Sequence, residues 1–233
     1  ARFSRHGSTE ESVTSPDWRR SDGWKKGCGM AESRLHQLSA RGQSVWIDYL
    51  SRDLLETGEL KRMMEEDAVV GVTSNPTIFQ KAISQGNAYD GQLKELLAEE
   101  SDPKEIFLHL AVRDVENALE LLAPVHEGNA EDGYVSIEVD PNLAFDTKAT
   151  YEEAIRLHEW IDRPNLYVKI PGTEPGLQAI EDCIAAGRSI NVTLLFSLEM
   201  HSASMEAYLR GLERFVEGGG DATKVRSVAS FFV

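Results

Sequence analysis

The sequence predicts an α/β protein whose parallel β-strands are covered by helices. Six short apolar runs alternate along the chain with longer segments in which apolar residues recur every three or four positions. Short apolar runs are typical of buried strands, and the longer spacing is typical of amphipathic helices. Strand followed by helix, repeated in this way, is the pattern of a parallel sheet.

The predicted strands are separated by turn residues and helical patterns. They are VWIDYL (45–50), AVVGVTSN (68–75), GYVSIEVD (133–140), NLYVKIP (165–171), SINVTLLF (189–196) and VRSVASFFV (225–233). The clearest helical patterns cover 103–125, 147–161 and 198–219, and the consecutive glycines at 218–220 are a stop signal for the last helix. A long helical insertion at 76–132 separates the second strand from the third.

Each predicted strand has one apolar face and one face with a polar group, because successive side chains point to opposite sides. Lys169 lies opposite Val168 and Ile170, and alternation places Thr193 opposite Leu194. The polar groups lie in the middle or C-terminal half of each run, where catalytic residues of a (β/α)8 barrel converge. A doubly wound sheet, covered on both faces, should carry fewer such groups, and no strand is followed by GxGxxG or GxxxxGKS/T. We therefore expect a (β/α)8 barrel.

Composition excludes several classes of protein. The 233 residues include 24 Lys and Arg against 39 Asp and Glu, a net charge of −15, which argues against nucleic-acid binding as the main role. No apolar run reaches the roughly 18 residues of a membrane-spanning helix. The two cysteines, Cys28 and Cys183, form no CxxC motif and fit a reducing cytoplasm.

Residues 1–29 differ in character from the rest of the chain. They lack apolar periodicity and carry six Lys or Arg against four acids, which leaves −17 on the remainder. They also lack the apolar segment of a secretory signal. We interpret 1–29 as a non-native or disordered extension before a natural start at Met30, and 30–233 as a partial barrel domain. A functional basic arm is the alternative for 1–29.

Lys169 is the sharpest chemical signal in the sequence. It lies within VKIP, where we expect it to point into the barrel. Burial disfavours the ammonium form of a lysine, and a neutral amine can attack a carbonyl carbon to form a Schiff base. The alternative is a lysine that extends to solvent at the strand end or pairs with a buried acid.

Other polar side chains in the predicted strands suit proton transfer or the binding of hydroxyl groups. Glu138 and Asp48 are acids in apolar runs, where burial suits a carboxyl to proton transfer; their alternative role is an ion pair with Lys169. The neutral groups, each of which could instead serve the structure, are Asn75, Asn191, Thr193 and Ser230. None of the six histidines lies in a strand run, and no HxH or HExxH occurs, so we expect no metal site.

The runs that carry these residues resemble the transaldolase family, particularly its bacterial branch. The resembling segments are SVWIDYLSRDLL, GVTSNPTIFQKAI, VSIEVDPNLAFDT, PNLYVKIPGTEPGLQAI, INVTLLFSLE and SVASFFV. They occur in the family's order and extend from about Ser44 to Val233. Each segment is moderately specific alone, and together they make the resemblance strong.

The resemblance implies a (β/α)8 barrel and a cytoplasmic transferase of the pentose phosphate pathway. Such an enzyme moves a dihydroxyacetone unit between sugar phosphates: sedoheptulose 7-phosphate and glyceraldehyde 3-phosphate give erythrose 4-phosphate and fructose 6-phosphate. The resemblance implies neither a metal nor an organic cofactor. Some relatives are fused to a glucose-6-phosphate isomerase domain, and such a fusion stays open here.

The resemblance also implies a role for each matching residue. Lys169 resembles the Schiff-base nucleophile, and Asp48 resembles the base that takes a hydroxyl proton as the carbon–carbon bond breaks. Glu138 resembles the acid that moves protons together with a water and Thr193. The residues that resemble the family's substrate-binding set are Asn75, Asn191, Ser230 and Phe232.

Two departures and two alternatives accompany the resemblance. About six of the eight β/α units are present, and the family's phosphate-binding arginines lie beyond Val233. We expect residues 1–233 alone to be inactive or prone to aggregation, because a part-barrel exposes two sheet edges.

The alternatives are a fructose-6-phosphate aldolase-like enzyme, which releases dihydroxyacetone, and a noncatalytic barrel. The insertion at 76–132 favours a transaldolase over the compact aldolase, and the acids beside Lys169 argue against a noncatalytic barrel.

Overall fold

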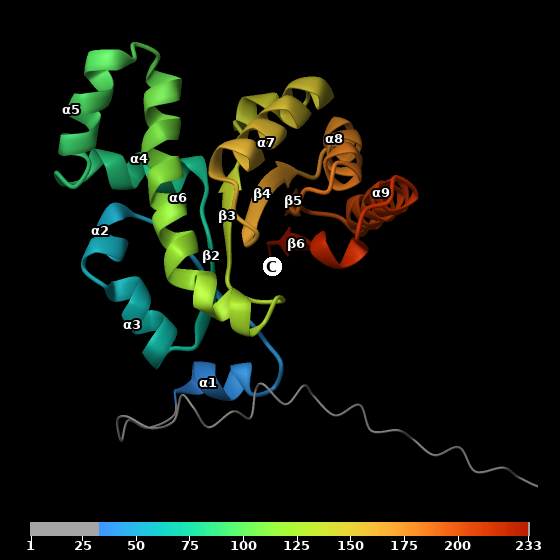
Figure 1. The fold of residues 1–233 in the computed structure, drawn as a ribbon, viewed down its shortest axis with the longest axis horizontal. Helices are drawn as coiled ribbons and strands as arrows, with labels where there is room; N and C mark the ends of the chain where they lie inside the picture. Colours follow the sequence, from blue (N-terminus) through green and yellow to red (C-terminus); the bar gives the residue numbers. More distant parts are fainter. Residues whose placement is uncertain (1–32, 233) are drawn as a thin grey trace, which may run out of the picture.

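The structure, a computed structural model, describes residues 33–232. Within them six strands form one parallel sheet: β1 (Val45–Asp48), β2 (Val69–Thr73), β3 (Tyr134–Glu138), β4 (Leu166–Pro171), β5 (Ile190–Leu195) and β6 (Ser227–Phe231). Each strand pairs with the next along the chain, in the order β1-β2-β3-β4-β5-β6. A doubly wound sheet reverses its order at a switch point, so this sequential order is that of a barrel wall. The predicted α/β barrel class is confirmed, as a curled part of a (β/α)8 barrel (Figure 1).

Helices connect the strands, and most of them cover the outer side of the sheet, whereas α1 precedes β1 and lies below the sheet in Figure 1. They are α1 (Arg34–Ser39), α2 (Arg52–Glu56), α3 (Glu59–Glu66), α4 (Pro76–Ser84), α5 (Asp90–Glu99), α6 (Pro103–Gly128), α7 (Thr147–Ile161), α8 (Glu174–Ala185) and α9 (Leu198–Glu217), with short 3-10 turns η3 (Pro141–Leu143) and η4 (Ala222–Lys224). The predicted insertion is confirmed as α4, α5 and α6. Residues 1–29 and Met30, to which our interpretation of the N-terminal segment applies, lie outside the described residues.

Side-chain caps fix where the helices begin after the C-terminal ends of three strands. Asn75 before α4, Thr173 before α8 and Ser197 before α9 each accept a hydrogen bond from the backbone N–H three residues ahead. Such a cap satisfies one of the helix N–H groups that otherwise lack a partner. The strand-to-helix turns beside the candidate site are therefore defined by local sequence.

The apolar core lies between the sheet and its helices. Val135, Val168 and Ile190, one from each of three neighbouring strands, are fully buried in one cluster. Leu119 of α6 and Leu157 of α7 belong to the same cluster and are also fully buried. Burying a side chain of this size stabilises the fold by roughly 1.5–3 kcal/mol. The apolar side chains occupy the strand face that the helices cover, and the polar side chains lie on the opposite face.

One sequence prediction about the fifth strand is wrong. Alternation placed Leu194 on the apolar face, but Leu194 is 39% exposed and has a positive φ of 60°. The pairing of β5 with β6 shifts register between Val192 and Leu195. An inserted bulge residue moves the following side chain to the other face, and Leu195 takes the buried position instead.

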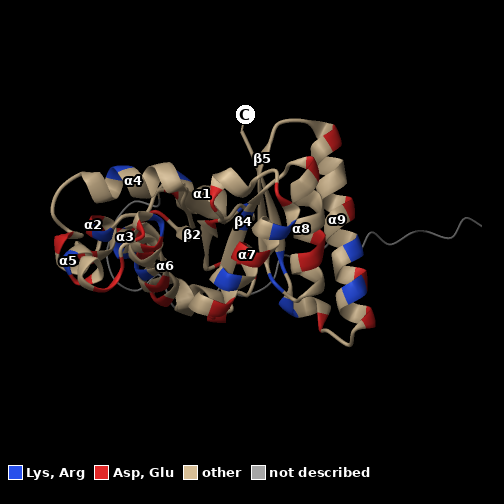
Figure 2. Cartoon of the chain, turned by 90° about the horizontal axis from the view of Figure 1, so that it is seen from above, with Lys and Arg blue, Asp and Glu red and all other residues tan. Residues whose placement is uncertain are grey.

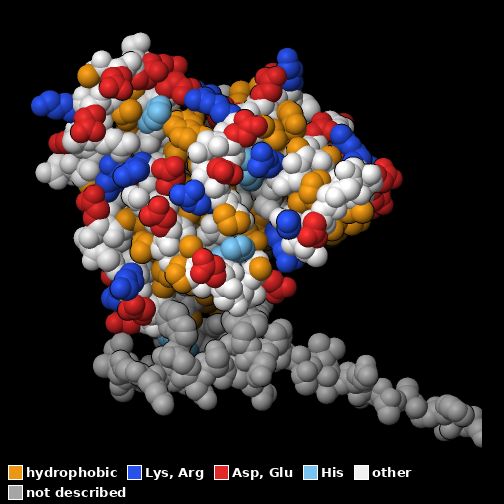
Figure 3. All heavy atoms as spheres, in the orientation of Figure 1, with side chains coloured by type: hydrophobic (Ala, Val, Ile, Leu, Met, Phe, Trp, Pro, Cys, Tyr) orange, Lys and Arg blue, Asp and Glu red, His pale blue; other side chains and the backbone are white. Residues whose placement is uncertain are grey.

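Charged side chains of both signs are spread over the helices. Figure 2 shows acidic and basic residues along α8 and α9, where Arg214 contacts both Glu181 and Asp182 at 2.9 and 2.7 Å. Figure 3 shows the two signs interspersed on one face of the molecule. Across residues 33–232, no helix is long and apolar enough to cross a membrane.

Candidate active site

Lys169 lies in the middle of the polar face of β4 and is buried. Only 6% of the residue is exposed. Its Nζ donates a hydrogen bond to the backbone carbonyl of Ser74 at 2.9 Å and lies 3.1 Å from Oε2 of Glu138. Two oxygen atoms from two other strand ends therefore fix the position of the amine.

Glu138 is the neighbour of Lys169 in the sheet. The pairing of β3 with β4 places the two residues opposite each other. Burial raises the pKa of the Glu138 carboxyl, the Lys169 ammonium opposes this rise, and the charge of Asp48 adds to it. A carboxyl group with a raised pKa is suited to give and take protons near neutral pH.

Asp48 approaches this pair from the first strand. It is the last residue of β1 and is paired in register with Thr73 of β2. Its charge acts on Glu138, while its own residue is exposed. The structure thus brings the two predicted acids and the predicted lysine to one side of the sheet.

Asn191 continues the same row on β5, opposite Lys169. Its Nδ2 donates to Oγ of Ser136 at 3.2 Å, and its Oδ1 accepts from Oγ of Ser230 at 2.9 Å. Asn191 is 1% exposed, so the two serines fix which way its amide points. Ser136 was not among the predicted site residues, although alternation puts it on the polar face of its strand with Glu138.

Thr193 and Thr73 add two buried hydroxyl groups to this face. Thr193 is 2% exposed, pairs in register with Pro171 and directly precedes the bulge at Leu194. The hydroxyl oxygen of Thr73 is buried without a hydrogen-bond partner among the described residues. Buried polar atoms are normally satisfied, so this orphan marks a place for a water or a ligand hydroxyl, and strand alternation alone gives no signal for it.

Two predicted site residues are placed less directly. Oδ1 of Asn75 accepts a hydrogen bond from the N–H of Ile78 at 3.0 Å, so this oxygen caps α4. Phe232 follows β6, is 60% exposed and stacks on Phe196 at a centroid distance of 5.6 Å. Within the described part of the chain, neither side chain forms a hydrogen bond with Lys169, whose polar partners are Ser74 and Glu138.

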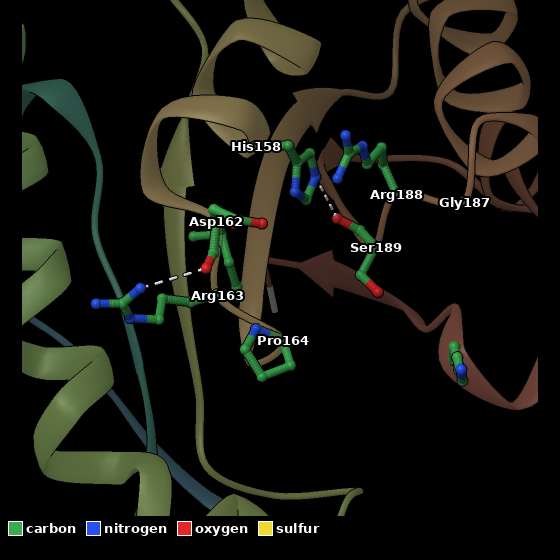
Figure 4. Close-up of a pocket in the computed structure, with 9 residues that line it drawn as sticks. His158, Asp162, Arg163, Pro164, Gly187, Arg188 and Ser189 are labelled. Carbon is green, nitrogen blue, oxygen red and sulfur yellow. Dashed lines mark hydrogen bonds between the residues drawn. The ribbon is translucent and has the colours of Figure 1, made fainter.

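A cavity of about 270 Å³ lies at the other end of the strands (Figure 4). Leu166 at the start of β4 and Ser189 just before β5 are in its lining. His158 in its wall is buried, with Nε2 3.1 Å from the Ser189 carbonyl oxygen, and burial lowers the pKa of His158 to about 4. The cavity contains none of the predicted site residues, so it is separate from the Lys169 cluster.

Comparison with known proteins gives a consistent result. Residues 45–233 match the family described as transaldolase/fructose-6-phosphate aldolase. Over 200 residues the chain is 53% identical to a transaldolase of Mycolicibacterium smegmatis, 50% identical to one of Mycolicibacterium paratuberculosis and 49% identical to one of Mycobacterium ulcerans. Each match covers 85% of this chain and 54% of the relative. The chain therefore spans about half the length of the curated relatives that it matches.

Proposed function

This chain belongs to the transaldolase/fructose-6-phosphate aldolase family, and from that premise we propose that the protein containing it transfers a dihydroxyacetone unit between sugar phosphates. The donor would be a ketose phosphate such as sedoheptulose 7-phosphate or fructose 6-phosphate, and the acceptor an aldose phosphate. We place this activity in the cytoplasm and in the pentose phosphate pathway. The observation that carries the proposal is a buried lysine held beside a buried carboxyl group on a barrel wall.

The first proposed step is imine formation on Lys169. The neutral Nζ attacks the ketose carbonyl carbon, and the resulting carbinolamine loses its hydroxyl group as water. Glu138, whose oxygen lies 3.1 Å from Nζ, is placed to deliver the proton that leaves with this water, with Thr193 orienting a water molecule. The raised pKa of Glu138 supports a role as a proton donor.

The second proposed step is cleavage of the carbon–carbon bond. Asp48 takes the proton of the hydroxyl group on the leaving-side carbon of the bond that breaks, and this carbon becomes the aldehyde carbon of the departing aldose. The electron pair of the broken bond moves to the protonated imine nitrogen, which gives an enamine on Lys169. An acid at the end of β1 and a lysine on β4 suit this division of roles, because the two groups act on different atoms of the substrate.

The third proposed step is transfer of the three-carbon unit. The enamine attacks the carbonyl carbon of the acceptor, Asp48 returns its proton to the new hydroxyl group, and water then hydrolyses the imine. Asn191 and Ser230, joined by a hydrogen bond of 2.9 Å, are placed to hold the retained unit, with Asn75 and Phe232 as further substrate contacts. Fixed hydrogen bonds of this kind stabilise charge without reorganisation during the reaction.

A fructose-6-phosphate aldolase is the second candidate, because the matching family includes both activities. An aldolase would release dihydroxyacetone by protonating the enamine, whereas a transaldolase passes it to an aldehyde. The insertion of α4, α5 and α6 and the names of the relatives support the transaldolase. Release of free dihydroxyacetone at the same rate with and without an aldose acceptor would favour the aldolase.

Borohydride trapping tests the proposal. With fructose 6-phosphate and borohydride, the protein that contains this chain should become reductively alkylated at Lys169, as located by peptide mass spectrometry. Lys169→Ala should abolish the adduct. Lys148→Ala, at a lysine whose side chain is 84% exposed on α7, is the matched control and should leave it intact. An adduct that persists in Lys169→Ala would overturn the assignment.

A further inference from the structure

A second buried polar network lies outside the proposed site, between α2 and the helical insertion. Nε of Arg52 lies 2.8 Å from Oδ1 of Asp114, and the hydroxyl of Tyr89 donates to Oδ2 of the same carboxylate at 2.7 Å. The backbone N–H of Arg52 in turn donates to the Tyr89 hydroxyl oxygen at 2.9 Å. The three residues form a closed ring in which both Asp114 oxygens have a partner.

The members of this ring come from three parts of the chain and are all buried. Arg52 begins α2, Tyr89 directly precedes α5 and Asp114 lies within α6. Their exposed fractions are 8%, 3% and 0%. The Arg52 guanidinium also lies over the Tyr89 ring, 4.6 Å from its centroid. The hydrogen-bonded ring of Arg52, Asp114 and Tyr89 therefore fixes the first turn of α2 to the insertion.

Stability alone explains this arrangement poorly. A buried ion pair must offset the cost of removing two charges from water and is often no more stabilising than apolar residues of the same size. Nη2 of Arg52 is moreover buried without a hydrogen-bond partner among residues 33–232. What the ring does provide is a precise position for the backbone at Arg52.

That backbone position matters for Asp48. The Asp48 carboxylate makes no hydrogen bond or ion pair within residues 33–232. Lys169 and Glu138, by contrast, contact each other at 3.1 Å. Asp48 is joined to Arg52 by three residues, of which Leu50 is fully buried and Ser51 caps α2. The position of Asp48 thus depends on how the chain that follows it is held.

We infer that the Arg52–Asp114–Tyr89 ring is a positioning network that holds Asp48 where it can take the substrate hydroxyl proton. This inference rests on the proposed function. It assigns the helical insertion a part in carbon–carbon bond cleavage, although none of its residues 76–132 is placed among the reacting groups. Misplacing a catalytic group by about 1 Å can slow a reaction by about 100-fold, so a modest loosening of this ring should be measurable.

Tyr89→Phe is the direct test, because it removes both hydrogen bonds of the hydroxyl and keeps the aromatic ring. Dihydroxyacetone with borohydride reports imine formation alone, since no carbon–carbon bond has to break. Single-turnover release of glyceraldehyde 3-phosphate from fructose 6-phosphate reports cleavage. In Tyr89→Phe we expect trapping on Lys169 within twofold of the wild type and cleavage slowed about tenfold. Tyr151→Phe on α7, at a partly buried tyrosine packed against the core, should change neither rate.

Hydrogen exchange supplies a readout that does not depend on activity. Amides of residues 46–54 should exchange faster in Tyr89→Phe than in Tyr151→Phe, because local opening of the segment that joins β1 to α2 becomes easier. Asp114→Asn, which keeps the shape of the carboxylate, should show the same separation of the two rates. The inference would be overturned if Tyr89→Phe lowered the trapping rate and the cleavage rate by the same factor. It would also be overturned if the variant left both the cleavage rate and the amide exchange of residues 46–54 unchanged. Absence of any Lys169 adduct in the wild type would instead overturn the proposed function, and the inference with it.

Discussion

The Lys169–Glu138 pair joins an amine and a carboxyl group in one buried contact. Burial raises the pKa of Glu138 even though the Lys169 ammonium opposes the rise. The carboxyl group therefore holds a proton more readily than a fully solvated glutamate does. In the proposed reaction the carboxyl group gives its proton as water leaves the carbinolamine and takes one when the imine is hydrolysed.

Glu138→Gln should slow imine formation. The amide cannot exchange a proton with the leaving water, and a positioned acid–base group contributes about 100-fold or more to such a step. The rate of borohydride trapping with dihydroxyacetone should fall by about that factor. In the wild type, its pH profile should contain a titration above the ordinary carboxyl value of 4.5, because burial raises the Glu138 pKa, and this titration should be missing in the variant.

Glu152→Gln is the matched control for this prediction. Glu152 lies on α7 with 62% of its side chain exposed, so its loss should leave both the rate and the pH profile unchanged. A Glu138→Gln protein that traps dihydroxyacetone at the wild-type rate would contradict the proton-transfer role. It would leave the ion pair with Lys169 as the function of Glu138.

The neighbours of single side chains were only partly predictable from the sequence. Strand alternation correctly placed Glu138, Lys169 and Asn191 on the polar faces of their strands, but the register that sets them side by side comes from the strand pairing. The backbone carbonyl of Ser74 that accepts from Lys169 could not be predicted, because its direction depends on where β2 ends. The unpaired hydroxyl of Thr73 could not be predicted for a similar reason, since alternation tells which face a side chain lies on but not which groups it hydrogen-bonds to.

Helices and strands differ in how well local sequence defines their ends. The predicted helix over 147–161 matches the bounds of α7, where Asp146 caps the first turn. The predicted strands ran one or two residues too long at several ends, where residues such as Leu50 and Val139 lie beyond the last residue of the strand. The bulge in β5 had no signal in a run as regular as INVTLL, since it depends on pairing with a neighbouring strand.

Gly71 of β2 should resist substitution because the neighbouring strand packs directly on it. A Cβ at this position would overlap the Trp46 ring of β1. Trp46 also faces Tyr167 of β4 at a centroid distance of 6.2 Å, so the ring has little freedom to move. We expect Gly71→Ala to lower the free energy of unfolding by about 1–3 kcal/mol, measured by urea denaturation.

Gly91→Ala provides the matched comparison. Gly91 lies within α5, and a Cβ there would meet no atom within 4 Å. Alanine is the better helix former by about 1 kcal/mol, so this variant should be at least as stable as the wild type. Equal effects of the two substitutions would show that Trp46 does not pack on Gly71 as described.

The order of the six strands decides what the sheet as a whole can do. Because each strand pairs with its neighbour in sequence, the C-terminal ends of β1, β3, β4 and β5 meet on one side of a curved wall. Asp48, Glu138, Lys169 and Asn191, which are up to 143 positions apart in the sequence, are thereby gathered without any long-range motif. Composition and periodicity predict the β/α units, but the curl that brings the units together arises only from the pairing.

Unfolding of the whole molecule should report the burial of His158. Burial lowers the pKa of His158 from 6.5 to about 4, so the folded chain binds this proton less readily than the unfolded chain. The stabilising contribution of the neutral imidazole is therefore present above about pH 6.5 and is lost as the pH falls toward 4, by up to about 3 kcal/mol. Glu138 and Asp114, whose pKa values are raised by burial, act in the opposite direction, so the wild-type slope alone is not diagnostic.

His158→Gln separates the imidazole contribution from these acids. The glutamine amide can still donate to the Ser189 carbonyl that His158 contacts at 3.1 Å, but it does not titrate. The free energy of unfolding of the wild type minus that of the variant should decrease between pH 6.5 and 4, as measured by urea denaturation at each pH. A flat difference for His158→Gln would mean that the folded and unfolded chains take up this proton equally, and that the imidazole is not buried in its neutral form.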